Sequence, residues 1–224
     1  MSSQNNNDNA DAEEQHNEEQ FELAFGEVHR HKRDDIRDIK NNNPLVKSFF
    51  IFERNDINGF SDISWRLLGR YIANNTHLQE LHFSGIGFSD ETIVQLFQEL
   101  TKSNSITNLN IGIFNIHMAL LRFGTAGVQS MLPFLQNSPQ LAKLDLSGNG
   151  INSQGFESLV NALDGGIIKQ LDLDGCSIED ISSLGNVTLR HLEMISLGAN
   201  TIHNIPPLEN YTGLTSLRLY GNSI

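Results

Sequence analysis

Three aspartates have the type and spacing of a site that binds positive charge. Asp145 and Asp172 occupy the same position of a repeated apolar pattern, and Asp174 follows Asp172 by two residues. Carboxylates that lie close together disfavour one another's ionisation, and they attract a basic segment of a partner protein. Two interpretations stay open, a docking site for such a segment and a merely hydrated polar surface. A calcium site is a weaker hypothesis, because Ca²⁺ usually takes about six or more oxygen ligands from a folded loop.

The other side chains capable of catalysis do not form a recognisable motif. The chain contains no P-loop, G-x-S-x-G, H-E-x-x-H or C-x-x-C sequence, and its eight histidines are dispersed. The one cysteine, Cys176, falls at a position that Asn fills in other copies of the repeated pattern. We therefore predict a buried structural thiol, no metal or cofactor, and no enzymatic activity of the chain itself.

An apolar pattern that returns six times must position the aspartates. Each copy reads apolar-x-x-apolar-x-apolar, and another apolar residue follows five residues after the third position. The six copies begin at Leu78, Ile106, Leu141, Ile168, Leu192 and Leu214. Alternating apolar positions favour a short strand with its apolar side chains inward and the intervening side chains in solvent. Asn149, Cys176, Asn200 and Asn222 follow the later strands, where a side chain can bond the backbone of the neighbouring loop.

These copies resemble the leucine-rich repeat, L-x-x-L-x-L-x-x-N/C-x-L. Residues 78–166 resemble the ribonuclease-inhibitor class of that family, and residues 167–224 look like the shorter repeats of phosphatase-regulatory proteins. The resemblance implies an α/β solenoid, a curved right-handed superhelix with parallel strands on its concave face and helices, then 3₁₀ turns, on its convex face. Starts of successive copies lie 28, 35, 27, 24 and 22 residues apart, so the late connections are too short for a full helix.

Three of the connections carry the signal of a helix start. Ser61, Ser89 and Ser153 each precede apolar residues spaced three and four apart. This is the pattern of a capped helix with one buried face. We therefore expect helices on the outer side of the early repeats.

The repeat that begins at Ile106 is longer than its neighbours. It holds seven extra residues relative to the preceding copy, around residues 116–124. Insertions in repeat proteins map to loops on one edge and often carry binding. This one either folds back over the core as a short helix, which we favour, or offers an apolar patch to a partner.

The sequence divides into three segments. Residues 1–20 are acidic and Asn-rich with almost no apolar side chain, which predicts disorder. Residues 21–44 predict a weakly helical flank that ends at an Asn-Asn-Asn-Pro break. Residues 45–224 form the predicted repeat domain, which opens with a divergent first repeat or cap, Val46-x-x-Phe49-x-Ile51. The chain stops at the last apolar position of a repeat with no capping helix, so we expect that it is truncated from a longer gene product.

Side chains between the apolar positions are expected to gather on the concave face, because neighbouring strands lie about 4.8 Å apart. Lys143 and Lys169 stand near the aspartates and offset part of their charge. Met194 and Tyr220 are the apolar exceptions on this polar face. Two interpretations stay open for them, an interface anchor and single apolar side chains scattered on the surface. The predicted partner-binding residues are Glu80, His82, Asp145, Asp172, Asp174, Arg218 and Tyr220.

Charge and composition narrow the class of partner and the compartment. The formal net charge is −12, which disfavours binding to nucleic acid. Acidic residues follow the basic stretch at residues 29–33 at once, so a hydrated helix face is favoured over a nuclear-import signal. The chain has no apolar run of about 18 residues and no secretory signal, and a single cysteine agrees with a reducing compartment. We predict a cytoplasmic protein that contacts neither nucleic acid nor membrane.

The leading hypothesis for function is a non-catalytic scaffold or adaptor that binds another protein on the concave face, through a basic segment of that partner. The resemblance also implies two alternatives. The ribonuclease-inhibitor-like part is similar to the repeat domain of the Ran GTPase-activating protein, and the late repeats are similar to phosphatase-regulatory subunits. Stimulated GTP hydrolysis, or capture of a phosphatase catalytic subunit, would single out one of these.

Overall fold

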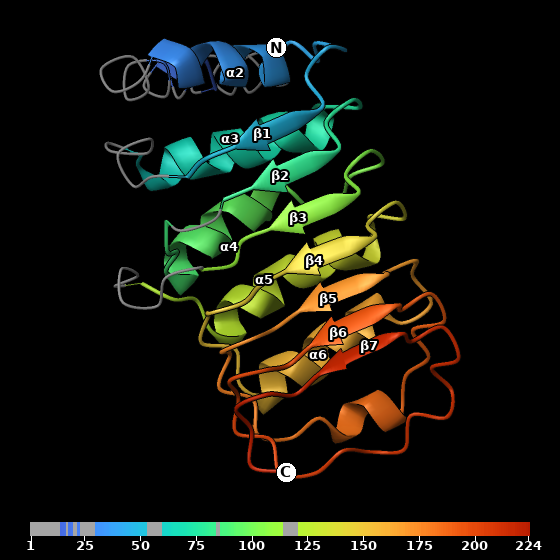
Figure 1. Cartoon of the computed structure of the whole chain (residues 1–224). Helices are drawn as coiled ribbons and strands as arrows, with labels where there is room; N and C mark the ends of the chain where they lie inside the picture. Colours follow the sequence, from blue (N-terminus) through green and yellow to red (C-terminus); the bar gives the residue numbers. More distant parts are fainter. Residues whose placement is uncertain are drawn as a thin grey trace, which may run out of the picture.

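The strands form a parallel sheet in which every strand pairs with the next one along the chain (Figure 1). This computed structural model describes residues 14–16, 18–19, 22, 30–52, 60–83, 86–113 and 121–224. Within them the sheet has seven strands in the order β1-β2-β3-β4-β5-β6-β7. Their bounds are Ser48–Phe50 (β1), Glu80–His82 (β2), Asn108–Asn110 (β3), Lys143–Asp145 (β4), Gln170–Asp172 (β5), Met194–Ser196 (β6) and Ser216–Arg218 (β7). The predicted α/β class with parallel strands is therefore confirmed.

Helices alternate with the strands and lie behind one face of the sheet (Figure 1). The α-helices are α2 (Arg30–Lys40), α3 (Asp62–Asn74), α4 (Asp90–Glu99), α5 (Thr125–Gln136) and α6 (Ser153–Leu163). A short 3₁₀ helix, η2 (Ser182–Gly185), follows β5, and in the described chain between β6 and β7 there is no helix. The predicted change from full helices to thin connections therefore occurs after α6.

Side-chain caps begin the early helices where the sequence predicts them, with one difference. Ser61 and Ser89 each accept a hydrogen bond at 3.3 Å from the backbone amide three residues further on, which starts α3 and α4. In α6 the capping side chain is Asn152, and Ser153 is the first helical residue. The Oδ1 atom of Asn152 accepts a hydrogen bond from the amide of Gly155 at 3.1 Å. Asn therefore satisfies a first-turn amide of the helix, as Ser does in α3 and α4.

The start of α5 is held by the preceding helix. Asp90, the first residue of α4, accepts hydrogen bonds from the amides of Gly124 and Gly127 at 2.8 and 2.7 Å. A carboxylate at a helix N-terminus also complements the helix dipole. Adjacent helices are thus joined by a charge-assisted cap as well as by packing.

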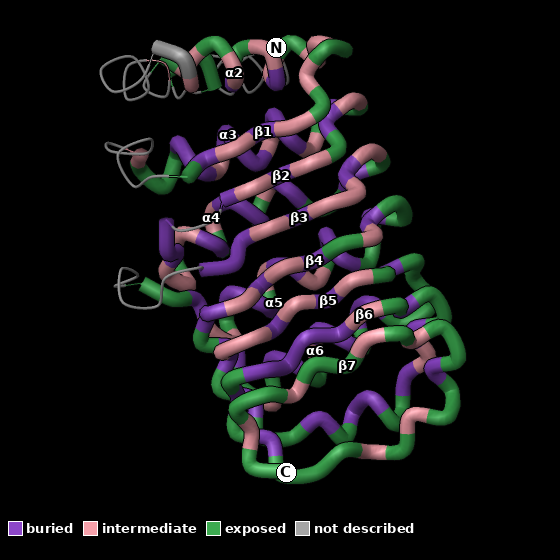
Figure 2. Tube along the Cα trace, viewed as in Figure 1, coloured by how far each residue is buried: buried purple, intermediate pink, exposed green. Residues whose placement is uncertain are grey.

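The middle residues of the strands stack into one continuous row. Parallel register aligns Phe49, Leu81, Leu109, Leu144, Leu171, Ile195 and Leu217. The first six are at most 1% exposed, whereas Leu217 is 36% exposed. Each fully buried side chain of this kind stabilises the fold by about 1.5–3 kcal/mol. Figure 2 shows the same trend, with buried segments through the sheet and helices and rising exposure at β7.

Aromatic rings fill the core near β1 and β2. Trp65 of α3 lies edge-on to Phe83 and Phe88, with ring centroids 6.5 and 5.1 Å away. Phe83 in turn lies edge-on to Phe49 at 6.1 Å. All four rings are at most 4% exposed. Such edge-to-face pairs add about 0.5–1.5 kcal/mol each beyond the burial of their surface.

Asparagine side chains hold the loops that follow the later strands. The Oδ1 atom of Asn200 accepts hydrogen bonds from the amides of Cys176 and Ile178 at 2.9 and 3.0 Å. Its Nδ2 atom donates to three carbonyl oxygens, those of Leu173, Leu197 and Gly198. Asn149 and Asn222 donate to loop and strand carbonyls in the same manner. The predicted backbone-bonding role of these residues is confirmed.

Cys176 takes the place of an asparagine in this series. It is fully buried, and its Sγ atom lies 3.4 Å from the carbonyl oxygen of Leu146. Burial raises the pKa of the Cys176 thiol to about 12, so the reactive thiolate does not form near neutral pH. The prediction of a structural thiol is confirmed.

Helix α2 covers the β1 end of the sheet. Ile36 and Ile39 are 2% and 0% exposed, and Lys32 Nζ donates to the carbonyl oxygen of Phe50 at 2.5 Å. The helix ends immediately before the Asn-rich break, and Asn42 adopts a left-handed φ of 52°. Within the predicted flank, residues 30–40 form α2, and the turn after it coincides with the predicted break.

The predicted disorder of residues 1–20 falls mostly outside the described residues. Of that stretch the structure describes 14–16, 18 and 19. Glu14 pairs there with Arg70 at 2.6 Å. The disorder of the tail stays a prediction.

The insertion around residues 116–124 is described only from residue 121 onward. Phe123 is fully buried there, and Leu121 is 40% exposed. The ring of Phe123 belongs to the core. The predicted alternatives, a short helix and an apolar patch, concern mainly residues that lie outside the described ranges.

Candidate functional site

One face of the sheet points away from the helices (Figure 1). Because side chains alternate along a strand, this face carries the two residues that flank each buried middle residue. We call it the open face. Its residues are Ser48, Phe50, Glu80, His82, Asn108, Asn110, Lys143, Asp145, Gln170, Asp172, Met194, Ser196, Ser216 and Arg218. Parallel register sets Asp145 beside Asp172, and Asp172 beside Ser196. Neighbouring strands are about 4.8 Å apart, so these side chains lie within reach of one another.

Asp145 is held in place by its neighbours on the open face. Its carboxylate accepts hydrogen bonds from Asn110 Nδ2 at 2.9 Å and from the amide and hydroxyl of Ser147 at 3.0 and 2.7 Å. Gly112 gives the carboxylate its room, because a Cβ atom there would overlap an oxygen of Asp145. The orientation of Asp145 is therefore set before any ligand arrives.

Asp174 is held by the strands that follow it. It accepts hydrogen bonds from Ser196 Oγ at 2.7 Å, the amide of Gly198 at 2.6 Å and the phenol of Tyr220 at 2.5 Å. The Tyr220 ring lies over Gly198, where any Cβ atom would overlap it. The hydrogen bond to Asp174 raises the pKa of Tyr220, because it favours the protonated phenol. Tyr220 thus forms one wall of the acidic region.

Asp172 lies beside Asp145 on the neighbouring strand and two residues before Asp174, and it accepts fewer hydrogen bonds than either. Within the described residues it accepts one hydrogen bond, from the amide of Asp174 at 3.1 Å. Partial burial raises the pKa of Asp172 to about 6, and the charges of Asp145 and Asp174 act in the same direction. The Asp174 amide and the charge of Arg218 oppose the rise. A cation bound beside Asp172 would relieve this repulsion.

The three aspartates line one side of a cleft. Its volume is about 730 Å³, and its walls include Arg122, Glu179 and Tyr220 besides the aspartates. Of the two lysines predicted to offset the acidic charge, Lys169 pairs with Glu193 at 3.0 Å. Lys143 is exposed on β4. We call Asp145, Asp172 and Asp174 the acidic cluster.

Aromatic rings lie at the β1 end of the open face, away from the aspartates. His82 stacks on Phe50 with ring centroids 4.7 Å apart and an interplanar angle of 17°. Phe50 stacks in turn on Phe52, at 5.5 Å and 20°. Phe52 is 57% exposed. We call Phe50, Phe52 and His82 the ring stack.

The predicted site residues therefore separate into two groups. Glu80 and His82 belong to the ring-stack end, where Glu80 Oε2 lies 3.6 Å from His82 Nε2. The acidic cluster and Tyr220 form the other group. Exposed Arg218 lies on β7, two strands from Asp172, and its charge acts on that carboxylate. Met194, half-buried on β6, borders a shallow groove that connects the groups.

Sequence reasoning missed the ring stack. Phe50 occupies the same position of its strand as His82, as the pairing of β1 with β2 shows. The divergent first copy, Val46-x-x-Phe49-x-Ile51, could have revealed it. Phe50 stands in that copy at the exposed position that His82 occupies in the next one, so the two side chains are expected to be neighbours. The Asn110 and Ser147 bonds to Asp145 carried no such signal, because they depend on side-chain rotamers.

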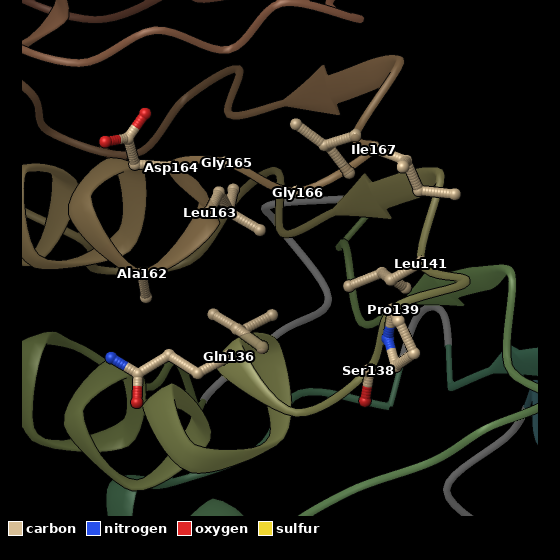
Figure 3. A pocket seen from close by; sticks show the side chains of 12 residues that line it. Gln136, Ser138, Pro139, Leu141, Ala162, Leu163, Asp164, Gly165, Gly166 and Ile167 are labelled. Atoms are coloured by element: carbon tan, nitrogen blue, oxygen red, sulfur yellow. The ribbon is translucent and has the colours of Figure 1, made fainter.

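A smaller hollow of about 250 Å³ lies between the C-terminal ends of α5 and α6, away from the open face (Figure 3). Apolar side chains such as Leu141 and Leu163 line much of it, together with Asp164. Asp164 already accepts a hydrogen bond from the amide of Thr188 at 2.9 Å. This hollow lacks the convergent polar groups that a specific ligand site needs.

In comparisons with known proteins, no protein-family model and no curated sequence matches the chain. Among the described residues, no three His, Cys, Asp or Glu side chains are grouped so that they would hold a metal ion. No helix in the described ranges is long and apolar enough to cross a membrane. The functional argument therefore rests on the open face itself.

Proposed function

We propose that the chain is a leucine-rich repeat protein that binds another protein on the open face of its sheet, and that a basic segment of the partner docks at the acidic cluster. Support for the repeat class comes from strands paired in sequence order and from Asn side chains at equivalent places after several strands. In such a solenoid the strand face is concave and free to contact a partner. The protein acts as a scaffold or adaptor.

One observation carries this proposal, the convergence of three carboxylates on one cleft with two of them fixed by hydrogen bonds. Oriented acceptors lose little conformational freedom on binding, so more of the interaction energy appears as affinity. Hydrogen bonds to charged groups contribute about 1.5–3 kcal/mol each. An arginine or lysine side chain of the partner satisfies Asp172, the least satisfied of the three.

Affinity capture from the native cell extract tests the proposal. The bait is the full chain, compared with a variant that carries Asp145→Asn, Asp172→Asn and Asp174→Asn. Asparagine keeps an acceptor oxygen and removes the charge, so the fold is less disturbed than by alanine. A control variant, Glu157→Gln with Glu209→Gln, removes charge from exposed residues away from the open face.

We expect a partner that the wild type and the control variant capture and that the neutralised variant loses by about tenfold or more. Raising the salt concentration should weaken this capture, because exposed charges are screened. Equal capture by all three baits would contradict docking at the acidic cluster. A small GTPase or a phosphatase catalytic subunit among the aspartate-dependent partners would favour one of the two alternative functions that the resemblance implies.

A further inference from the structure

The open face carries the ring stack at its β1 end and the acidic cluster over β4 and β5, and this arrangement points to the kind of segment that the face recognises. We propose that the open face binds one extended peptide, with an apolar or aromatic side chain on the ring stack and an arginine or lysine at the acidic cluster, about four to six residues away. This inference rests on the proposed function and adds the pattern of the partner segment. A peptide with either feature alone binds more weakly.

The ring stack supplies the apolar end. Phe50 is half-buried on β1, and Phe52 exposes 57% of its surface beside it. The stacking of His82 on Phe50 extends the ring surface from β1 to β2. Exposed aromatic rings that are already stacked on one another lose little rotamer freedom when a ligand covers them, so they serve as an anchor.

A shallow groove of about 190 Å³ joins the two ends. Its lining runs from His82 through the carboxamides of Asn108, Asn110 and Gln170 to Asp172, and it includes Lys143 and Asp145, one charge of each sign. Carboxamide side chains both donate and accept hydrogen bonds, so this lining suits the alternating amides and carbonyls of an extended backbone. Charged side chains of one sign do not have this property. The groove therefore favours a peptide that continues from one end to the other.

Strand spacing sets the length of the recognised segment. Phe50 lies on β1, Asp145 on β4 and Asp172 on β5, which are three and four strand steps away in the sheet order. At about 4.8 Å per step, the two distances are about 14 and 19 Å. An extended peptide advances about 3.3 Å per residue, so about four to six residues cover them.

Charge complementarity fixes the second feature of the occupant. The cleft at the acidic cluster is large enough for a long side chain. Four carboxylates line it, those of the cluster and of Glu179, against one guanidinium, that of Arg122. Lys169, which flanks β5, is already paired with Glu193. A cationic side chain from outside is the complement of such a cleft. The ring stack binds a side chain without charge, so the ring stack and the acidic cluster recognise different types of residue.

Fluorescence anisotropy with synthetic peptides and the full chain tests this inference. Each labelled peptide carries Trp, a Ser/Gly spacer and an Arg-Arg pair, and the Trp-to-Arg separation is about two, five or nine residues, chosen around the strand spacing. A matched set carries Ser in place of Trp. Binding is measured with the wild type, with Phe52→Ser and with the variant that carries Asp145→Asn, Asp172→Asn and Asp174→Asn. The control is Leu45→Ser, which alters an apolar residue that is 86% exposed.

We expect the Trp peptide with the middle separation to bind about tenfold more tightly than its Ser counterpart. Phe52→Ser should abolish this gain, and Leu45→Ser should preserve it. Circular dichroism and an unchanged urea midpoint check that each variant is folded.

Three results would overturn the inference. Equal affinities of the Trp and Ser peptides would remove the aromatic end, and a gain independent of separation would mean that one chain does not span both ends. Both results leave the proposed function standing if binding still depends on the acidic cluster. If no Arg-containing peptide binds in an aspartate-dependent way, docking of a basic segment is itself wrong, and the inference falls with it.

Discussion

Between β1 and β3 the interior is filled with aromatic rings and each connection contains an α-helix, whereas from β4 to β7 asparagines tie the loops together and the last connections are thin. Both halves bury the row of middle residues, and the first half adds aromatic contacts beneath a layer of helices. In the second half, hydrogen bonds from side chain to backbone hold each loop to its neighbour, so a connection needs less cover. One sheet therefore continues from β1 to β7 although the contacts that hold its connections change along it.

The open face changes between the same halves without a change in the strands. Rings stack at β1 and β2, and carboxylates gather at β4 and β5. Each strand contributes two flanking side chains to this face, and their backbone positions are set by the row of buried residues between them. The chemistry of the surface can therefore vary while the core stays the same.

Removing a ring from the aromatic half should have the largest effect. Phe83→Ala deletes a side chain that is 1% exposed and contacts three other rings, so we expect a loss of about 4 kcal/mol in the free energy of unfolding. Urea unfolding followed by the fluorescence of Trp65, the only tryptophan, measures it. Phe52→Ala, at an exposed ring, serves as the control and should cost well under about 1 kcal/mol. A loss for Phe83→Ala below that level would contradict an aromatic core that supports the first half.

Breaking the asparagine bonds of the second half should have the next largest effect. Asn200→Asp keeps the acceptor oxygen but turns a carboxylate toward the carbonyls of Leu173, Leu197 and Gly198. We expect a loss of about 3 kcal/mol, because buried carbonyls lose their donor and a charge is desolvated. Circular dichroism during urea unfolding should change more than Trp65 fluorescence, since each repeat contacts only its neighbours. Asn161→Asp on the exposed side of α6 is the control, and an equal loss there would argue against the loop ties.

Charge removal at Asp172 should stabilise the protein, with a dependence on pH. The folded-state pKa of Asp172 is about 6, above the value of about 3.9 for an unfolded chain. The folded state thus binds this proton more tightly, and the stability that protonation contributes is lost as pH rises from about 4 through 6. Asp172→Asn should raise the free energy of unfolding by about 1 kcal/mol near pH 7.5, a value that allows for the partial exposure of the side chain. Near pH 4.5 it should change the free energy of unfolding very little.

Urea unfolding at the two pH values measures this difference. Asp174→Asn is the matched comparison at the neighbouring carboxylate. Asp174 accepts three hydrogen bonds, so its neutralisation should not stabilise the protein at either pH. A stabilisation by Asp172→Asn that is the same at both pH values would mean that repulsion within the cluster is not its cause.

The smallest effect on stability should come from Tyr220→Phe. The substitution removes the phenol that donates to Asp174, but Tyr220 is 61% exposed and the Ser196 and Gly198 donors remain. We expect a loss of about 0.5 kcal/mol in the free energy of unfolding, because an exposed hydrogen bond competes with water. Urea unfolding measures it. A loss above about 2 kcal/mol would show that Tyr220 is part of the core of the second half.

Much of the fold could be predicted because repeated apolar positions fix both the strands and their register. The repeat alone aligns Asp145 with Asp172, and the two residues are paired across β4 and β5. The tie from Tyr220 to Asp174 could not be predicted, because it depends on the space above Gly198 and on a side chain that bends across a strand. The cap of α6 lies one residue earlier than expected, at Asn152, since Asn and Ser are both good caps and the sequence does not rank them.

The docking of positive charge at the acidic cluster is the central claim, and carboxyl ¹³C NMR tests it most directly. The full chain is titrated with the Arg-Arg peptide of middle separation while the carboxyl resonances of Asp and Glu are followed. We predict that Asp145, Asp172 and Asp174 shift together and saturate, while Glu157 and Glu209 stay unchanged. Small, unsaturated shifts spread evenly over all exposed carboxylates would contradict the claim and leave the acidic cluster as a hydrated polar surface.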